Sequence, residues 1–258
     1  MEPYEFLLHT IQEAGKLLLQ KRDEGFEISS KGGNPRDIVT SVDLAVNDFI
    51  IAEIRRAYPE HGIYSEEGSG AENKSEYLWT IDPIDGSANF ARGIPHFAIS
   101  LGLLHKGEPA LGAVFNPVTQ ELFSFKKGEG AFLNGKRIFV SNITDLAQSY
   151  VFFHTGRKKE LHEWGGRSYA ALLGRAKKTE NFAGSSLDAC FVAAGRIEAN
   201  IYGTLSTLDI SAAIGILKEA GGIVANEKGE EISFSKESQK IFMANNREIL
   251  SQAREIIQ

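Results

Sequence analysis

Cysteine is almost absent from this chain of 258 residues. Cys190 is the only one, which excludes an internal disulfide and a metal site built from several thiolates. A single thiol is compatible with a reducing compartment, and we interpret it as a core side chain.

Long hydrophobic runs are also lacking. Although 42% of the residues are hydrophobic, no stretch approaches the roughly 18 apolar residues of a membrane-spanning helix. The N-terminal segment MEPYEFLLHTIQEAGKLLLQ mixes acidic and basic residues among its apolar ones, unlike a secretory signal. We therefore expect a soluble, cytoplasmic protein with no membrane partner.

The chain has no excess of positive charge. Its formal net charge is -6, with 28 Lys and Arg residues against 34 Asp and Glu residues. Because binding to a nucleic-acid backbone depends on clustered cations, we expect no nucleic-acid partner. A small anionic substrate would need divalent cations between itself and the carboxylates.

Two classes of hydrolase lack their sequence signatures. The nucleophile elbow Gly-x-Ser-x-Gly of many serine hydrolases occurs around neither Ser185 nor Ser206. A zinc hydrolase needs closely spaced histidines, whereas the six histidines of this chain are scattered without ligand spacing. They are His9, His61, His96, His105, His154 and His162.

Hydrophobic periodicity indicates helices at the start of the chain and strands in its middle. Apolar residues three and four positions apart predict a helix from Phe6 to Leu18. A second helix is predicted after a loop from Lys31 to Pro35, with Thr40 or Ser41 as its cap. Between residues 96 and 138, short apolar runs separated by Gly, Pro and Asn predict an antiparallel sheet.

From about Ser141 the pattern changes to alternating strands and helices, which predicts an α/β layer. Predicted strands lie in YVFFHTG, EANIYG and GIVAN, and the last residues predict a terminal helix. We therefore expect an N-terminal half over residues 1–140 and a C-terminal half over residues 141–258, packed as one compact unit around a cleft.

An acidic turn follows the short apolar run from Tyr77 to Ile81, which we expect to be a strand that stops at Asp82. In DPIDGS, residues 82–87, two carboxylates three positions apart can face one pocket. A helix that starts after this turn would offer backbone amides to a phosphate. Taken alone, Asp-Pro and Asp-Gly are ordinary turn dipeptides, Glu66-Glu67 is a solvated pair and Asp209 is a helix cap.

Five blocks of sequence, in this order, resemble the inositol monophosphatase family. They are DIVTSVD at 37–43, GIYSEEG at 62–68, WTIDPIDGSANF at 79–90, AGSSLDACFVAAGRIEA at 183–199 and STLDISAAIGILKEAGG at 206–222. This family belongs to a superfamily of magnesium-dependent, lithium-sensitive phosphomonoesterases that includes fructose bisphosphatase. The resemblance covers nearly the whole chain.

The resemblance implies two or three Mg²⁺ ions per subunit. Glu66, Asp82 and the carbonyl oxygen of Ile84 would hold the first ion. Asp82, Asp85 and Asp209 would hold the second, so Asp82 would bridge the two. Oxygen ligands of this kind are those that magnesium prefers.

The resemblance also implies catalytic roles for three residues. Glu66 and the hydroxyl of Ser87 would orient the attacking water, and Asp43 would polarise that hydroxyl. Family members more often carry threonine where this chain has Ser87, and the hydroxyl is kept. Lys31 would add positive charge nearby without a catalytic role.

Substrate contacts are implied for a larger set, whose members are Asp85, Gly86, Ser87, Gly184, Ser185, Ser186, Tyr202 and Asp209. Tyr202 stands where inositol-specific members carry a glutamate, and Leu208 stands where they carry a tryptophan. A tyrosine offers one hydroxyl and an aromatic face, so we expect selectivity to shift toward another polyol, sugar or ring-bearing phosphate.

The fold implied by the resemblance is a five-layered αβαβα sandwich of the sugar-phosphatase type, with a larger mixed sheet and a smaller sheet behind it. The implied activity is hydrolysis of a small, inositol monophosphate-like ester by a homodimer. Alternative substrates are fructose bisphosphate, histidinol phosphate, adenosine bisphosphate and NADP. A different alternative is a weakly catalytic regulatory or binding protein built on the same fold.

Overall fold

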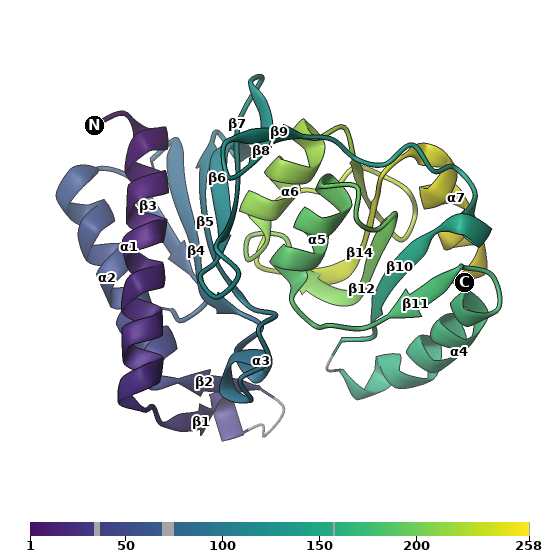
Figure 1. Cartoon of the computed structure of the whole chain (residues 1–258), viewed down its shortest axis with the longest axis horizontal. Helices are drawn as coiled ribbons and strands as arrows, with labels where there is room; N and C mark the ends of the chain where they lie inside the picture. The colour runs from purple at the N-terminus through teal and green to yellow at the C-terminus, as the bar shows by residue number, and fades with distance from the viewer. Residues whose placement is uncertain (34–36, 69–74, 157, 258) are drawn as a thin grey trace.

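Two large β-sheets and three layers of helices alternate through the molecule (Figure 1). The computed structural model describes residues 1–33, 37–68, 75–156 and 158–257. Helices α1 (Pro3–Glu24) and α2 (Ser41–Ala57) cover the first sheet, and α4 (His162–Leu173) and α7 (Arg247–Ile256) cover the second. Between the sheets lie α5 (Ser185–Ala193) and α6 (Ser211–Glu219). This order of layers confirms the expected αβαβα sandwich.

The first sheet has seven strands, in the order β3-β4-β5-β6-β7-β8-β9. Their bounds are Gly62–Ser65, Tyr77–Asp85, Ala98–His105, Glu108–Asn116, Glu121–Lys126, Gly130–Leu133 and Lys136–Ile138. All neighbours pair antiparallel except β3 and β4, which are parallel. The predicted antiparallel strands are therefore confirmed, and the sheet is mixed.

Strand β4 does not stop at Asp82, as the sequence had indicated, but runs on to Asp85. Asp82 lies opposite Ser100 of β5 and Asp85 lies opposite Ala98, with a shift of register between the two positions. This irregularity is a β-bulge, which accommodates Pro83 because proline has no N–H to give to the ladder. The acidic turn is thus the bulged end of a strand.

The second sheet has five strands, in the order β11-β10-β12-β14-β13. Their bounds in that order are Lys178–Glu180, Tyr150–His154, Ala199–Ser206, Ser238–Ala244 and Ile223–Asn226. Strands β10, β11 and β12 are parallel, whereas β14 runs antiparallel to both of its neighbours. The predicted strands at β10, β12 and β13 are confirmed, and the sequence reading missed β11 and β14.

The remaining helices and strands of the described residues are short. Strands β1 (Ile28–Ser30) and β2 (Ile38–Thr40) form a hairpin, and α3 (Ser87–Ala91) follows the bulge of β4. The 3₁₀-helices are η1 (Lys31–Gly33), η2 (Leu146–Gln148) and η3 (Lys159–Leu161). Of the loop predicted from Lys31 to Pro35, residues 31–33 form η1 and the others lie outside the described residues.

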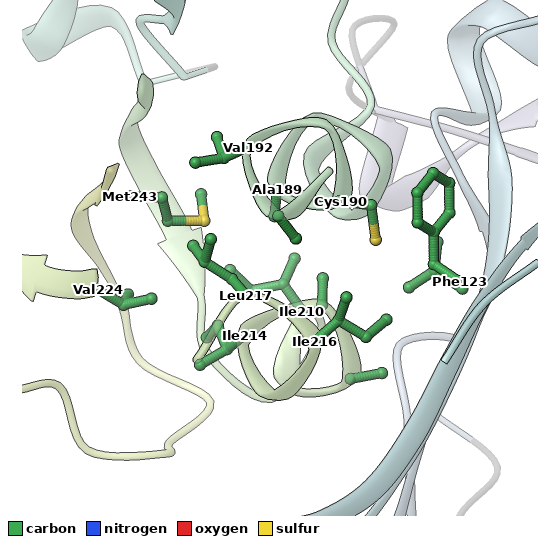
Figure 2. Close-up of a cluster of buried hydrophobic side chains, with 14 of the residues drawn as sticks. Phe123, Ala189, Cys190, Val192, Ile210, Ile214, Ile216, Leu217, Val224 and Met243 are labelled. Atoms are coloured by element: carbon green, nitrogen blue, oxygen red, sulfur yellow. The ribbon is translucent and has the colours of Figure 1, made fainter. Parts of the chain in front are cut away.

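The middle layer is apolar on both of its faces. Figure 2 shows side chains of α5, among them Ala189 and Cys190, next to side chains of α6 and to Phe123 of the first sheet. Met243 and Val224 of the second sheet close the same cluster. Cys190 is fully buried here, which confirms it as a core thiol. Because both helices are locked between two sheets, the residues at their N-terminal ends are held in place.

Within the part of the chain that the structure describes, no helix is both long enough and apolar enough to cross a bilayer.

Candidate active site

The bulge of β4 buries two carboxylates next to the middle layer. Asp82 is 4% exposed and Asp85 is 7% exposed. Asp82 Oδ1 accepts a hydrogen bond from its own turn, from the backbone N–H of Ile84 at 3.1 Å. Burial of charged groups this deep is unfavourable unless partners compensate for the lost hydration.

Asp85 finds such partners at the start of α5. Its Oδ1 accepts hydrogen bonds from the N–H of Ser185 at 3.1 Å and from the Ser185 hydroxyl at 2.6 Å, and Oδ2 accepts from the N–H of Ser186 at 2.7 Å. A carboxylate at this position also interacts favourably with the helix dipole. Two residues of the segment predicted to contact the substrate, Ser185 and Ser186, therefore bind Asp85 in this structure.

Asp209 approaches from the C-terminal half, just before α6. The N-cap of that helix is Ile210, so the simple interpretation of Asp209 as a helix cap is wrong. The hydroxyl of Tyr64, on β3, donates a hydrogen bond to Asp209 Oδ1 at 2.8 Å. Tyr64 was not selected from the sequence, because an aromatic residue in a short strand is usually a packing residue.

Glu66 and Glu67 follow directly after β3, and both pair with Lys31. The Lys31 ammonium lies 2.9 Å from Glu66 Oε1 and 2.8 Å from Glu67 Oε1. Burial opposes the charged ammonium, but the two carboxylates outweigh it and raise the pKa of Lys31. Glu67 is the more buried of the two acids, so the pair is not the solvated surface feature that it resembles in isolation.

Asp43 connects the first turn of α2 to Ser87. Thr40 caps this helix in a capping box with Asp43: the Thr40 N–H and hydroxyl both donate to Asp43 Oδ2. The other oxygen, Oδ1, lies 3.0 Å from the Ser87 hydroxyl, which also lies 2.8 Å from the Ile84 carbonyl oxygen. A hydroxyl has one proton, so Ser87 donates to one of these acceptors at a time.

Gly86, between the bulge and α3, has a left-handed backbone with φ of 87°. A Cβ at this position would lie 3.0 Å from the carbonyl oxygen of His96 and 3.4 Å from Phe97. Glycine at this position therefore lets the chain at His96 and Phe97 pack closely against it.

The four carboxylates of Glu66, Asp82, Asp85 and Asp209 are called the acidic cluster below. Burial, and then the charges of Glu66 and Asp85, raise the pKa of Asp82 well above its usual value. Burial raises the pKa of Asp85 to about 6, against the hydrogen bonds from Ser185. Burial and then Glu66 raise the pKa of Asp209 to about 6, against the hydrogen bond from Tyr64. Each anion is thus costly in the absence of a further cation.

Asp43 shares part of this cost. Burial raises its pKa, although the hydrogen bonds from Thr40 and Ser87 act in the opposite direction. Asp43 is therefore a buried acid whose Oδ2 stabilises the helix cap and whose Oδ1 contacts the Ser87 hydroxyl.

The acidic cluster is not a ready-made metal cage. Among the described residues, no group of three or more His, Cys, Asp or Glu side chains is arranged to hold an ion. The carboxylates of Glu66, Asp209 and Asp85 contact Lys31, Tyr64 and Ser185. The chemistry of the donors nevertheless fits Mg²⁺, which takes carboxylate and carbonyl oxygens. The raised pKa values of Asp82, Asp85 and Asp209 reflect a repulsion that a divalent cation would relieve.

A second group of polar side chains, made of Asp188, Tyr202 and His96, is called the Asp188 network below. Asp188 of α5 accepts a hydrogen bond from the Tyr202 hydroxyl at 2.9 Å and lies 2.7 Å from His96 Nε2. Tyr202 is only 4% exposed, and its ring stacks on His154 at 5.0 Å. The predicted substrate residue Tyr202 thus gives its hydroxyl to Asp188 in this structure. No sequence signal pointed to Asp188 or distinguished His96 from the other histidines.

Comparison with known proteins gives a consistent set of relatives. The sequence model described as "Inositol monophosphatase family" matches residues 2–258. The chain is 36% identical to the Nus factor SuhB of Pseudomonas aeruginosa over 229 residues, which are 86% of this chain and 84% of the relative. It is 34% identical to the fructose-1,6-bisphosphatase/inositol-1-monophosphatase of Thermotoga maritima over 237 residues, 92% of this chain and 90% of the relative.

Among solved structures, the IMPase of Thermotoga maritima is similar with a TM-score of 0.90 and 31% identity, covering 100% of this chain and 97% of that one. The extragenic suppressor protein SuhB of Bartonella henselae is similar with a TM-score of 0.92 and 27% identity, covering 98% and 97% of the two chains.

Proposed function

Because this chain belongs to the inositol monophosphatase family, we propose that it is a magnesium-dependent hydrolase of a small phosphate monoester. The observation that carries the proposal is the acidic cluster, in which Asp82 is buried against the charges of Glu66, Asp85 and Asp209. Burial of these charges together is unfavourable without a cation, whereas with a cation bound they can support metal-assisted hydrolysis.

The residues that would hold Mg²⁺ are those of the acidic cluster together with the Ile84 carbonyl oxygen. When bound, the ions would neutralise the phosphoryl oxygens and lower the pKa of a water molecule. Lys31 contributes a further positive charge beside Glu66. We expect two or three ions per subunit, with Asp82 among the residues that would hold them.

The protein itself supplies the means to orient the attacking water. Ser87 can donate its proton to Asp43 Oδ1, which leaves the lone pairs of the Ser87 oxygen free to accept a hydrogen bond from water. Asp43 is held in place for this by Thr40. Glu66, the more exposed acid of its pair, would accept the proton that this water loses.

The leaving group would be a polyol or sugar, or another ring-bearing alcohol. Tyr202 in place of an acidic residue removes an anionic acceptor for ring hydroxyls, and its own hydroxyl is taken up by Asp188. The Thermotoga maritima relative is named for two substrates, fructose-1,6-bisphosphate and inositol-1-phosphate, which supports testing both.

Release of phosphate from a substrate panel tests the proposal. The panel contains myo-inositol monophosphate, fructose bisphosphate, histidinol phosphate, adenosine bisphosphate and NADP, each with Mg²⁺ and with EDTA. We expect release that requires Mg²⁺ and is lost in Asp209→Asn, with the folded state of that variant checked by circular dichroism. Equal release with and without Mg²⁺, or near-normal turnover by the folded variant, would contradict the proposal. Inhibition by lithium is an additional expectation.

A regulatory or binding role is the second candidate. The observation in its favour is that the Pseudomonas aeruginosa relative is named a Nus factor. No release from any substrate, together with no Mg²⁺ binding measured by calorimetry, would favour this role, whereas Mg²⁺ binding without release would indicate a substrate outside the panel. We further propose a cytoplasmic homodimer that binds neither membrane nor nucleic acid. Sedimentation tests the homodimer, and filter binding tests for nucleic-acid binding.

A further inference from the structure

Two neighbouring strands of the first sheet hold the start of α6 through side-chain hydroxyls. Tyr64 of β3 and Thr80 of β4 are register partners in the parallel pair, so their side chains share one face of the sheet. The Tyr64 hydroxyl donates to Asp209 at 2.8 Å, and the Thr80 hydroxyl lies 2.6 Å from that of Ser211. Asp209 and Ser211 flank Ile210, the N-cap of α6.

The packing around the second of these contacts is tight. On β5, a Cβ at Gly102 would lie 2.6 Å from the Thr80 hydroxyl and 3.0 Å from the Ser211 hydroxyl. Glycine at this position therefore gives α6 the room to reach the sheet. The two hydroxyl contacts differ in one respect: Thr80 meets another hydroxyl, whereas Tyr64 meets a carboxylate of the acidic cluster.

Tyr64 is also held from the side of the C-terminal half. The ammonium of Lys236 lies 5.4 Å from the centre of the Tyr64 ring. The segment that carries Lys236 is tied to the turn before Asp209, because the Ser235 N–H donates to the Thr207 hydroxyl at 2.7 Å. The phenol is thus fixed between β3 and the turn that presents Asp209.

The phenol is the hydrogen-bond donor in this contact, because an ionised carboxylate can only accept. The hydrogen bond occupies Oδ1 of Asp209, and a carboxylate has two oxygens with about four lone-pair sites in all. Acceptor capacity for a cation therefore remains on the same carboxylate.

We propose that Tyr64 is a positioning residue, whose hydroxyl orients Asp209 toward Asp82 and Asp85 and so increases the affinity of the acidic cluster for a divalent cation. The inference rests on the proposed function, because it assumes that the cluster binds Mg²⁺. Partners that orient a ligand in this way strengthen metal binding even though they do not touch the metal.

The test compares Tyr64→Phe with Thr80→Val by calorimetric titration of the metal-free proteins with Mg²⁺. Each variant removes one hydroxyl contact between the first sheet and the start of α6 and keeps most of the side-chain volume. We expect Tyr64→Phe to weaken Mg²⁺ binding about 10-fold, and Thr80→Val to change it less than about 2-fold. Unchanged binding by Tyr64→Phe, or equal weakening by both variants, would overturn the proposal, since equal weakening would mean a loosened contact between the layers.

A double-mutant cycle with Asp209→Asn asks whether Tyr64 acts through Asp209. In the Asp209→Asn background, Tyr64→Phe should leave the remaining Mg²⁺ binding unchanged, and a further loss there would overturn the proposal. Thermal unfolding in EDTA verifies that each variant is folded. Wild-type protein that binds no Mg²⁺ would refute the proposed function and this inference together, whereas binding that ignores Tyr64→Phe would refute the inference alone.

Discussion

The acidic cluster and the Asp188 network differ in how their buried anions are compensated. Asp188 is 1% exposed and has two side-chain partners, Tyr202 and His96. Asp82 is buried almost as deeply, yet its hydrogen bond comes from its own turn and its charged neighbours are acids. A buried acid with matched partners is compensated within the fold, whereas a buried acid among acids is unfavourable unless a cation binds.

The largest effect is expected at the centre of the acidic cluster. Asp82→Asn removes the shared negative charge, so phosphate release should fall by roughly a thousand-fold or more, because a metal clamp contributes several kcal/mol to the transition state. In EDTA the same variant should unfold at an equal or higher temperature than wild type, since the amide relieves the repulsion. A lower unfolding temperature in EDTA would show that Asp82 is compensated as Asp188 is.

Substitution of Asp188, in contrast, should destabilise the fold whether or not Mg²⁺ is present. Asp188→Ala removes the partner of both Tyr202 and His96, so the free energy of unfolding should fall by about 2 to 4 kcal/mol. Chemical denaturation with EDTA and with Mg²⁺ measures this, and the loss should be similar in both. Asp188→Asn, which keeps an acceptor, is the matched control and should lose less. A loss confined to the Mg²⁺-bound protein would assign Asp188 to the metal site instead.

The next largest effect is expected in the dependence of folding stability on pH. Asp85 and Asp209 have a pKa of about 6 in the folded protein, above their ordinary value of 3.8. The metal-free folded state therefore binds more protons than the unfolded state between about pH 4 and 6, and its stability falls as pH rises through that range.

Bound Mg²⁺ requires deprotonated carboxylates, so its stabilising effect should rise with pH over the same range. The measurement is the unfolding temperature with Mg²⁺ minus that with EDTA, from pH 4.5 to 7.5, with an expected increase of several degrees. Asp82→Asn serves as the control, in which the increase should be much smaller. A difference that stays flat in wild type would be inconsistent with the raised pKa values.

The smallest effect is expected for Tyr202→Phe. This change removes one of the two side-chain partners of Asp188 and keeps the ring that stacks on His154, so the free energy of unfolding should fall by about 1 kcal/mol. Chemical denaturation measures the loss, and Tyr169→Phe, which removes a hydroxyl contact on α4, is the control. No loss at all would mean that His96 alone suffices to compensate Asp188.

The sequence predicted the architecture well where the signal was periodic. The two N-terminal helices follow from apolar residues spaced for one face, and the antiparallel strands follow from short apolar runs between turn residues. Strand β14 was missed because only its last four residues are apolar and buried, a run too short to be distinctive. The bulge after Asp82 was missed because Asp-Pro normally ends a strand, whereas here pairing with β5 continues to Asp85.

The site residues follow a similar division. The carboxylates of the acidic cluster were selected by their motifs, and the structure gathers their charges around Asp82. Tyr64, Glu67 and Asp188 were not selected, since their roles depend on partners. Tyr64 and Asp209, for example, are 145 positions apart.

The sequence by itself determined the family, the order of helices and strands along the chain, and the residue types available for chemistry. Each of these can be inferred from local patterns and motifs. Only the tertiary structure decided which acids are compensated. Whether a carboxylate meets a donor or another carboxylate depends on how the two halves pack. That packing is set by α5 and α6, whose buried faces bring Asp85 to Ser185 and Asp209 to Tyr64.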